Sequence, residues 1–319
     1  MSGRRVAAID IGTNSVLLLI AEPGDDGSLR RVLDLATITR IGQGVDRTGE
    51  LATEAIARTL GCIDRYASAI REHDVRRVAA VGTSALRDAR GSDDFVAAFE
   101  ARVGVRPEII SGEREATLTF DGALTGLALT EANERVAVFD VGGGSTEIIV
   151  GRPIADAEGA QIEHVVSLNV GAVRMTERHI RSDPPTSSEL EAIRIDVRAA
   201  LDDAPHITGA SLAGIPLVGV AGTVTTVGAV VAGLEAYEPD VVHGATLGRS
   251  ELTQTIGRLA ALDLAARREV PGLDPGRADV IVAGALVVDE VRARARADAL
   301  TISDRGVRYG LARELLAAG

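Results

Sequence analysis

The sequence predicts an α/β protein with two domains, each built on a mixed β-sheet flanked by helices. Short apolar runs alternate with longer segments in which apolar residues recur every three or four positions, as strands alternating with helices would. A strand, a glycine-containing turn and a second strand open the chain, and the arrangement returns 130 positions later. A length of 319 residues also fits two domains better than one or three.

The repeated segment is the clearest local feature. Residues 6–9 are an apolar run that leads into Asp10-Ile11-Gly12-Thr13-Asn14-Ser15, and residues 16–21 are apolar again. Residues 136–139 lead in the same way into Asp140-Val141-Gly142-Gly143-Gly144-Ser145, before another apolar run. Both segments fit Asp-apolar-Gly-x-x-Ser between two strands. We interpret the recurrence as an internal duplication, and the hairpins predict mixed rather than wholly parallel sheets.

Apolar spacing and turn residues place the other elements. In the first half we expect a helix at 53–72, a strand at 78–81, a helix from an N-cap at Ser92 to Arg102, and a helix that opens at Gly112. In the second half we expect a helix from Ser187 or Ser188, a strand turning into a helix over 218–226, a helix over 278–295, a strand at 300–302 and a last helix from about Val307.

These elements predict where the domains divide. The first domain should span residues 1–130 and the second residues 131–304, joined by the small and polar segment 126–134. A terminal helix over about residues 305–319 can pack back on the first domain.

Composition excludes several classes of protein. The net charge is −12, and such an acidic chain does not favour sequence-independent binding to nucleic acid. All 34 basic residues are arginine. The apolar run before Asp10 is too short for a signal peptide, and no stretch is long and apolar enough to span a membrane. The single cysteine, Cys62, excludes an internal disulfide or a thiolate zinc cluster. We therefore expect a cytoplasmic protein with no nucleic-acid or membrane partner.

The two turns predict phosphate-binding sites. Glycine lets backbone N–H groups converge on an anion, and Gly142-Gly143-Gly144 with Ser145 and Thr146 adds two hydroxyls. Gly12, Thr13, Asn14 and Ser15 offer similar chemistry with fewer glycines. Asp10 and Asp140 would repel phosphate unless a divalent cation, Mg²⁺ or Mn²⁺, lies between the carboxylates and the phosphate oxygens. Each turn alone could be an ordinary tight hairpin, but the matched pair favours binding.

Two further strand ends have residues of the same kind. Thr83 and Ser84 end a strand and are followed by Arg87, whose guanidinium could hold phosphate oxygens or form a surface salt bridge. Gly222 and Thr223 stand at the corresponding strand end in the second half, where glycine could equally serve close strand–helix packing.

Taken together, these motifs resemble the exopolyphosphatase and guanosine pentaphosphate phosphohydrolase family, a branch of the actin-like, sugar kinase and Hsp70 ATPase superfamily. The resemblance covers nearly the whole chain, and its most specific part is the Ser-Gly-x-x-Glu-Ala start of a helix between the two turns. The matching segments are residues 8–15, 82–89, 110–116, 139–147, 219–226, 275–279 and 303–306.

The resemblance implies two ribonuclease-H-like domains with an active-site cleft between them. It places the family's catalytic base on Glu115, with Glu113 as the nearby competitor, and implies that Glu147 binds metal or positions its waters. Arg114 stands where many relatives have an acidic residue. The chain is similar to the short, two-domain form, and relatives imply a homodimer.

The predicted activity is hydrolysis of the terminal phosphoanhydride of inorganic polyphosphate by an in-line water. Guanosine pentaphosphate is the alternative substrate, although the chain has only seven aromatic residues to stack on a base. From other classes, a small-molecule kinase would leave Glu115 unexplained, and an actin-like filament or ligand-gated regulator would leave the acidic motifs unexplained. Activity should require the divalent cation.

Overall fold

The computed structural model describes residues 4–24, 28–127, 134–153, 160–204, 207 and 209–318. It forms two compact units, which we describe separately. Unit 1 comprises Met1–Gly122 and Val307–Gly319, and unit 2 comprises Ala123–Gly306. The domain boundary predicted between residues 130 and 131 lies outside the described residues, and most of the predicted connection at 126–134 lies there too. None of the described helices is both long and apolar enough to cross a bilayer.

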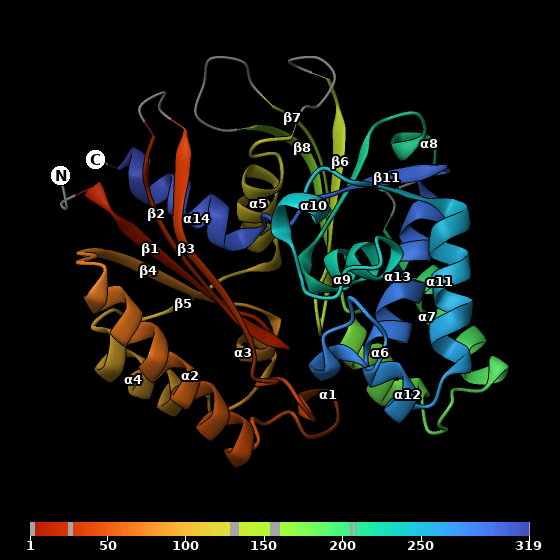
Figure 1. Ribbon diagram of the computed structural model, residues 1–319, viewed down its shortest axis with the longest axis horizontal. Coiled ribbons are helices and arrows are strands. Elements are labelled where there is room, and N and C mark those ends of the chain that lie inside the picture. The colour runs from red at the N-terminus through yellow and green to blue at the C-terminus, as the bar shows by residue number, and fades with distance from the viewer. Residues whose placement is uncertain are drawn as a thin grey trace. The chain divides into compact units, whose positions relative to one another are not determined.

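Unit 1 is built on a five-stranded sheet in the order β3-β2-β1-β4-β5 (Figure 1). β1 pairs antiparallel with β2 and parallel with β4, so the sheet is mixed, as predicted. The strands are β1 (Val6–Ile11), β2 (Ser15–Pro23), β3 (Leu29–Ile38), β4 (Arg77–Gly82) and β5 (Glu108–Ile109).

Helices cover both faces of this sheet. Successive side chains of β1 alternate between the faces. Ile9 packs with residues of α2 and α4, whereas Ala8 packs with residues of α5 and α14. The terminal helix α14 thus packs against the first sheet. The helices of this unit are α1 (Val45–Thr48), α2 (Thr53–Glu72), α3 (Ser84–Asp88), α4 (Ser92–Val103), α5 (Gly112–Ala123) and α14 (Val307–Ala317).

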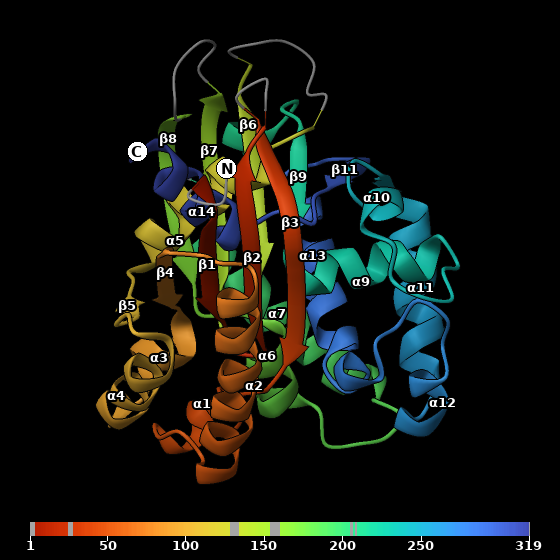
Figure 2. The same cartoon turned by 60° about the vertical axis from the view of Figure 1, so that its left-hand side comes forward.

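Unit 2 has a six-stranded sheet in the order β10-β11-β9-β6-β7-β8 (Figure 2). β6 pairs antiparallel with β7 and parallel with β9, which repeats the pairing of β1 with β2 and β4. The strands are β6 (Val136–Val141), β7 (Thr146–Pro153), β8 (Ala160–Leu168), β9 (Leu217–Val220), β10 (Thr246–Gly248) and β11 (Ala299–Ile302).

The core of unit 2 is centred on α13, every residue of which from Ile281 to Arg292 is buried. Phe139 of β6 packs in the same apolar cluster as Val224 of α9, Ile193 of α7 and Leu286 of α13. The helices are α6 (Ala172–His179), α7 (Ser187–Asp202), α8 (Gly209–Leu212), α9 (Ala221–Val231), α10 (Pro239–Val242), α11 (Arg249–Ala261), α12 (Leu264–Arg268) and α13 (Ile281–Arg294).

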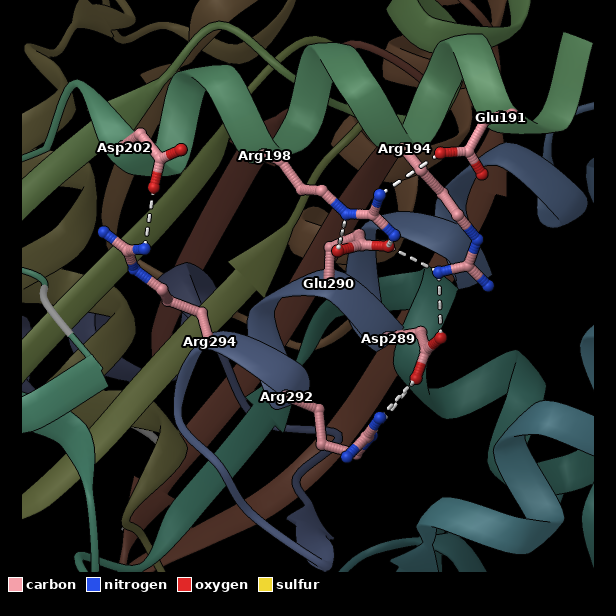
Figure 3. Close-up of polar contacts among 8 residues, drawn as sticks. All are labelled: Glu191, Arg194, Arg198, Asp202, Asp289, Glu290, Arg292 and Arg294. Carbon is pink, nitrogen blue, oxygen red and sulfur yellow. Dashed lines mark hydrogen bonds and ion pairs between the residues drawn. The ribbon is translucent and has the colours of Figure 1, made fainter.

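Ion pairs fasten α7 to α13 at the edge of this core (Figure 3). Glu290 of α13 accepts hydrogen bonds from Arg194 and Arg198 of α7. Arg194 also donates to Asp289, which accepts two hydrogen bonds from Arg292. Asp289 and Glu290 are buried, so each carboxylate needs these partners to offset the loss of hydration.

The structure confirms most predicted elements and corrects two helix starts. Ser92 is the first residue of α4 rather than its N-cap, because Gly91 takes the left-handed conformation that ends the preceding turn. The helix predicted over 278–295 begins at Ile281, because Pro275–Arg277 form a separate 3₁₀ turn. Thr186 and Glu189 form a reciprocal capping box that explains the start of α7 at Ser187.

Candidate functional site

The first turn, between β1 and β2, leaves backbone donors available. The N–H of Gly12 donates to the carbonyl oxygen of Ser15 at 3.0 Å, which closes the turn. Within the described part of the chain, no acceptor takes the N–H groups of Thr13 and Asn14. Two adjacent unpaired N–H groups in a tight turn form an anion-binding concavity.

The side chain of Asn14 also lacks a partner. It is only 6% exposed, yet neither its amide oxygen nor its amide nitrogen has a hydrogen-bond partner among the described residues. A buried amide left unpaired destabilises the protein, so such a group commonly marks a position that a ligand or an ion completes. Asn14 is therefore a fitting contact for a bound polar ligand.

Thr83 and Ser84 lie against this turn because β4 runs parallel to β1 and ends beside it. The hydroxyls of Thr13 and Ser84 are 2.8 Å apart and hydrogen-bonded. The backbone N–H of Thr83 donates to the carbonyl oxygen of Ile11 at 3.2 Å. The sheet register thus brings together the two strand ends that the sequence predicts as phosphate contacts.

Glu115 lies in the first turn of α5 and is 7% exposed. Nη1 of Arg87, which follows the β4 strand end on α3, is 3.2 Å from Oε2 of Glu115. The same nitrogen donates to the carbonyl oxygen of Ile110 at 2.9 Å. Arg87 thus holds the carboxylate of Glu115 to the segment from which α5 starts.

Glu113, the competing candidate for the catalytic base, is exposed. Hydrogen bonds from its own backbone N–H and from the Ser111 hydroxyl lower its pKa, and the charge of Arg87 lowers it further. A carboxylate with a lowered pKa accepts protons less readily. Glu115, by contrast, is buried and ion-paired with Arg87.

Asp10 lies at the end of β1 and is buried, at 8% exposed. By the alternation of side chains along a strand, Asp10 shares a face with Val6 and Ala8, which pack with residues of α5 and α14. Asp10 is therefore on the face of the sheet that α5 covers, and α5 also carries Glu115. The sequence-predicted residues of unit 1 gather at one end of its sheet.

The second turn, between β6 and β7, repeats the first. The N–H of Gly142 donates to the carbonyl oxygen of Ser145 at 3.0 Å. Among the described residues, the N–H groups of Gly143, Gly144 and Ser145 have no acceptor. This turn thus offers three unpaired donors.

Asp140 and Glu147 stand directly opposite each other on β6 and β7. Opposite residues of an antiparallel pair project on the same face with their Cβ atoms about 5 Å apart. Glu147 is fully buried, and the Ser167 hydroxyl donates to its Oε1 at 2.7 Å. Two carboxylates this close suit a hard divalent cation, which takes oxygen ligands. The described residues include no group of three or more acidic, histidine or cysteine side chains that could hold a metal ion, so water and ligand oxygens would complete the coordination.

Gly222 and Thr223 lie where β9 passes into α9. The Thr223 hydroxyl donates to the carbonyl oxygen of Val141 at 3.2 Å, much as Thr83 contacts Ile11 in unit 1. Ala221 has a φ of 68°, a left-handed conformation that costs a non-glycine residue on the order of 1 kcal/mol. A Cβ on Gly222 would lie 2.3 Å from Cζ of Arg277, so a larger residue here would push that guanidinium aside.

Sequence reasoning gave no role to Arg277, Arg174 or Ser167. Arg277 stands in residues 275–279, a segment matched by resemblance alone, and that match was the one available signal for it. Nε of Arg174 donates to the carbonyl oxygen of Gly144 at 2.6 Å from 30 residues further along the chain. Nothing in the local pattern around Arg174 or Ser167 indicates these contacts.

Comparisons with known proteins identify the family of this chain. A family model described as "Ppx/GppA phosphatase family" matches residues 19–318. This chain belongs to the Ppx/GppA phosphatase family. The fold is the predicted α/β type of that family, with two ribonuclease-H-like, actin-like units whose mixed sheets are flanked by helices.

Relatives in the Ppx/GppA family match this chain over most of its length. "Exopolyphosphatase 2" of Mycobacterium tuberculosis strain H37Rv is 40% identical, and the alignment covers 99% of each chain. "Guanosine-5'-triphosphate,3'-diphosphate pyrophosphatase" of Vibrio atlanticus is 30% identical over 97% of this chain and 59% of its own length.

Solved structures of the Ppx/GppA family have the same fold. A crystal structure of an "exopolyphosphatase-like protein" has a TM-score of 0.90 at 34% identity and covers 98% of both chains. The Aquifex aeolicus member of the Ppx/GppA family has a TM-score of 0.80 at 31% identity and covers 99% of both chains.

Proposed function

We propose that this phosphatase is an exopolyphosphatase that releases orthophosphate from the end of inorganic polyphosphate. The observation that carries the proposal is the pair of matched turns, in which Thr13, Asn14, Gly143, Gly144 and Ser145 offer unpaired N–H groups. A chain of phosphates presents the same anion repeatedly, and a duplicated anion-binding turn suits such a substrate. The name of the M. tuberculosis relative supports the same activity.

Glu115 is the general base in this proposal. Its carboxylate would take a proton from the water that attacks the terminal phosphorus, while the bond to the rest of the phosphate chain breaks. A base of this kind contributes on the order of 10²–10⁴-fold to the rate. The ion pair with Arg87 keeps the carboxylate oriented, and Arg87 would also neutralise charge on the transferring group.

Asp140 and Glu147 would hold Mg²⁺ or Mn²⁺, and the metal-binding role of Asp10 stays a prediction from the sequence. Asp140 and Glu147 fit such an ion because they face each other across β6 and β7 and offer only hard oxygen ligands. A bound cation would neutralise phosphate charge. Thr83, Ser84, Gly222 and Thr223 lie at the strand ends beside the turns and would contact further phosphates.

The acidity of the chain does not conflict with a polyanionic substrate. The net charge is −12, but exposed charges more than about 8 Å away are largely screened at physiological ionic strength. Backbone donors and arginines within hydrogen-bond distance then decide the local affinity.

Guanosine pentaphosphate is the alternative substrate, because the V. atlanticus relative is named for a guanosine polyphosphate. The residue that covers Gly222 is Arg277 rather than an aromatic side chain. A base could stack on a guanidinium, so the structure leaves this substrate chemically open.

Cytoplasmic location and a homodimer stay predictions from the sequence.

Phosphate release should be measured in parallel from short polyphosphate, long polyphosphate and guanosine pentaphosphate, with and without excess chelator. We expect release from polyphosphate that chelator abolishes. Glu115→Gln is the control, because it keeps the size of the side chain and removes the base. Release from guanosine pentaphosphate alone would favour the alternative, and full turnover in chelator would contradict the role of the metal.

A further inference from the structure

The segment that begins α6 forms hydrogen bonds with the backbone of the turn Gly142–Ser145. The N–H of Ala172 donates to the carbonyl oxygen of Gly142 at 2.9 Å, and those of Val173 and Arg174 donate to that of Gly143 at 2.8 and 3.0 Å. Nε of Arg174 donates to the carbonyl oxygen of Gly144 at 2.6 Å. All three glycine carbonyls of the turn therefore face the start of α6.

This arrangement fixes the direction of the unpaired donors. In a trans peptide, the carbonyl of one residue and the N–H of the next point in opposite directions within one plane. Holding the carbonyls of residues 142, 143 and 144 therefore directs the N–H groups of residues 143, 144 and 145 to the other side. Those three N–H groups are the unpaired donors of the turn.

Glycine peptides need such support because they rotate more freely than others. The backbone also comes very close here: a Cβ on Gly171 would lie 2.6 Å from the carbonyl oxygen of Gly143. Residue 171 must therefore be glycine for the segment to approach the turn.

In unit 1 the corresponding carbonyl of the turn is held by backbone N–H groups alone. The carbonyl oxygen of Asn14, 130 positions before Gly144, accepts from the N–H groups of Thr39 and Arg40 at 3.0 and 2.9 Å. In unit 2 the carbonyl of Gly144 receives the guanidinium of Arg174 instead. The side chain replaces a pair of backbone donors.

We propose that Arg174 is a positioning residue of the phosphate-binding turn: by holding the Gly144 carbonyl, it aims the Ser145 N–H at a bound phosphate. The bond is charge-assisted, which makes it stronger than a bond between neutral groups. This inference rests on the proposed function, because it assumes that the turn binds phosphate. It concerns a residue to which the sequence gave no role.

Arg174→Met tests the inference, because methionine keeps most of the side-chain length and removes every donor. We expect the KM for polyphosphate to rise about tenfold, the factor for a loss of 1.4 kcal/mol, with a smaller change in kcat. Arg174→Lys restores a cationic donor and should recover most of the loss. Arg181→Met is the matched control, because Arg181 also donates to backbone carbonyls, of Glu177 and Ile180, near the far end of α6.

A KM for Arg174→Met within twofold of wild type would overturn the inference, as would a rise in KM that lysine does not reverse. Binding of inorganic tripolyphosphate, measured by calorimetry, separates this failure from that of the proposed function. If wild type hydrolyses nothing but binds tripolyphosphate about tenfold more tightly than Arg174→Met, the inference stands without the activity. If wild type does not bind tripolyphosphate, both are wrong.

Discussion

The turns Gly12–Ser15 and Gly142–Ser145 follow strands that pair in the same way and close through the same Gly N–H to Ser carbonyl hydrogen bond. The register shifts between Ile20 and Ala21 on β2, and again between Val150 and Gly151 on β7, 130 positions later. A shared bulge at matching positions supports internal duplication of the hairpin, because a bulge is a specific feature of a strand pair.

The two hairpins differ in the side chains that they place at the turn and on the paired strands. Leu17 stands opposite Asp10 where Glu147 stands opposite Asp140. Asn14 adds a buried amide where unit 2 has Gly144, and unit 1 contributes the candidate base, the buried Glu115 that is ion-paired with Arg87. Both copies have unpaired backbone donors, while the facing carboxylates Asp140 and Glu147 lie in unit 2 and the candidate base lies in unit 1.

Exchanging the residue that distinguishes the hairpins should have the largest effect. Glu147→Leu gives unit 2 the residue that unit 1 has, and we expect phosphate release to fall roughly 10²–10³-fold, the loss typical of removing one group that stabilises the transition-state charge. Steady-state assays over a range of Mg²⁺ concentrations measure it, with Leu17→Met as the control. Near-normal activity of Glu147→Leu would show that the difference between the hairpins is not functional.

The next effect concerns stability. Glu290→Gln removes the charge that pairs with Arg194 and Arg198, and we expect the free energy of unfolding to fall by roughly 2–3 kcal/mol, slightly less than for a fully buried pair because Arg198 is half exposed. Glu191→Gln, on the exposed side of the same cluster, should change it by less than about 0.5 kcal/mol. Urea denaturation measures both. Equal effects would mean that burial of the Glu290 pairs is unimportant.

Asn14→Gly makes the turn of unit 1 resemble that of unit 2. We expect the KM for polyphosphate to rise about tenfold, as loss of one hydrogen bond to a charged ligand would cause. The melting temperature should not fall, because an unpaired buried amide is removed. A lower melting temperature with an unchanged KM would assign Asn14 a purely structural role.

The smallest effect is a dependence of stability on pH in unit 2. Burial lowers the pKa of His243, the charge of Arg305 lowers it further, and Asp304 and Asp240 oppose the shift. The unfolded chain then binds a proton below about pH 6.5 that the folded chain does not, so His243 lowers stability as the pH falls below that value. Between pH 7 and pH 5, the free energy of unfolding should fall more for wild type than for His243→Gln. A constant difference would contradict the assignment.

The sequence was sufficient for the local features of both hairpins. Strand, turn and strand lie within some 16 consecutive residues, so the pattern around Asp10 and Asp140 is enough to predict each hairpin. The helix Thr53–Glu72 was also predicted, from Thr53 to about Glu72, because its apolar spacing is regular.

Contacts between distant segments could not be predicted. Arg174 reaches the turn Gly142–Ser145, and Arg277 reaches Gly222, through side chains that leave no periodic signal. The position of Arg87 against Glu115 depends on how β4 and α5 pack. The 3₁₀ turn before α13 was missed for a similar reason, because Asp274 caps it through a bond to Gly276 that apolar spacing does not reveal.

A crystal structure of Glu115→Gln soaked with inorganic tripolyphosphate and Mg²⁺ tests most directly whether the two turns bind phosphate. The account predicts phosphate oxygens about 2.7–3.2 Å from the N–H nitrogens of Thr13 and Asn14 and also of Gly143, Gly144 and Ser145. Tripolyphosphate bound away from both turns would contradict it.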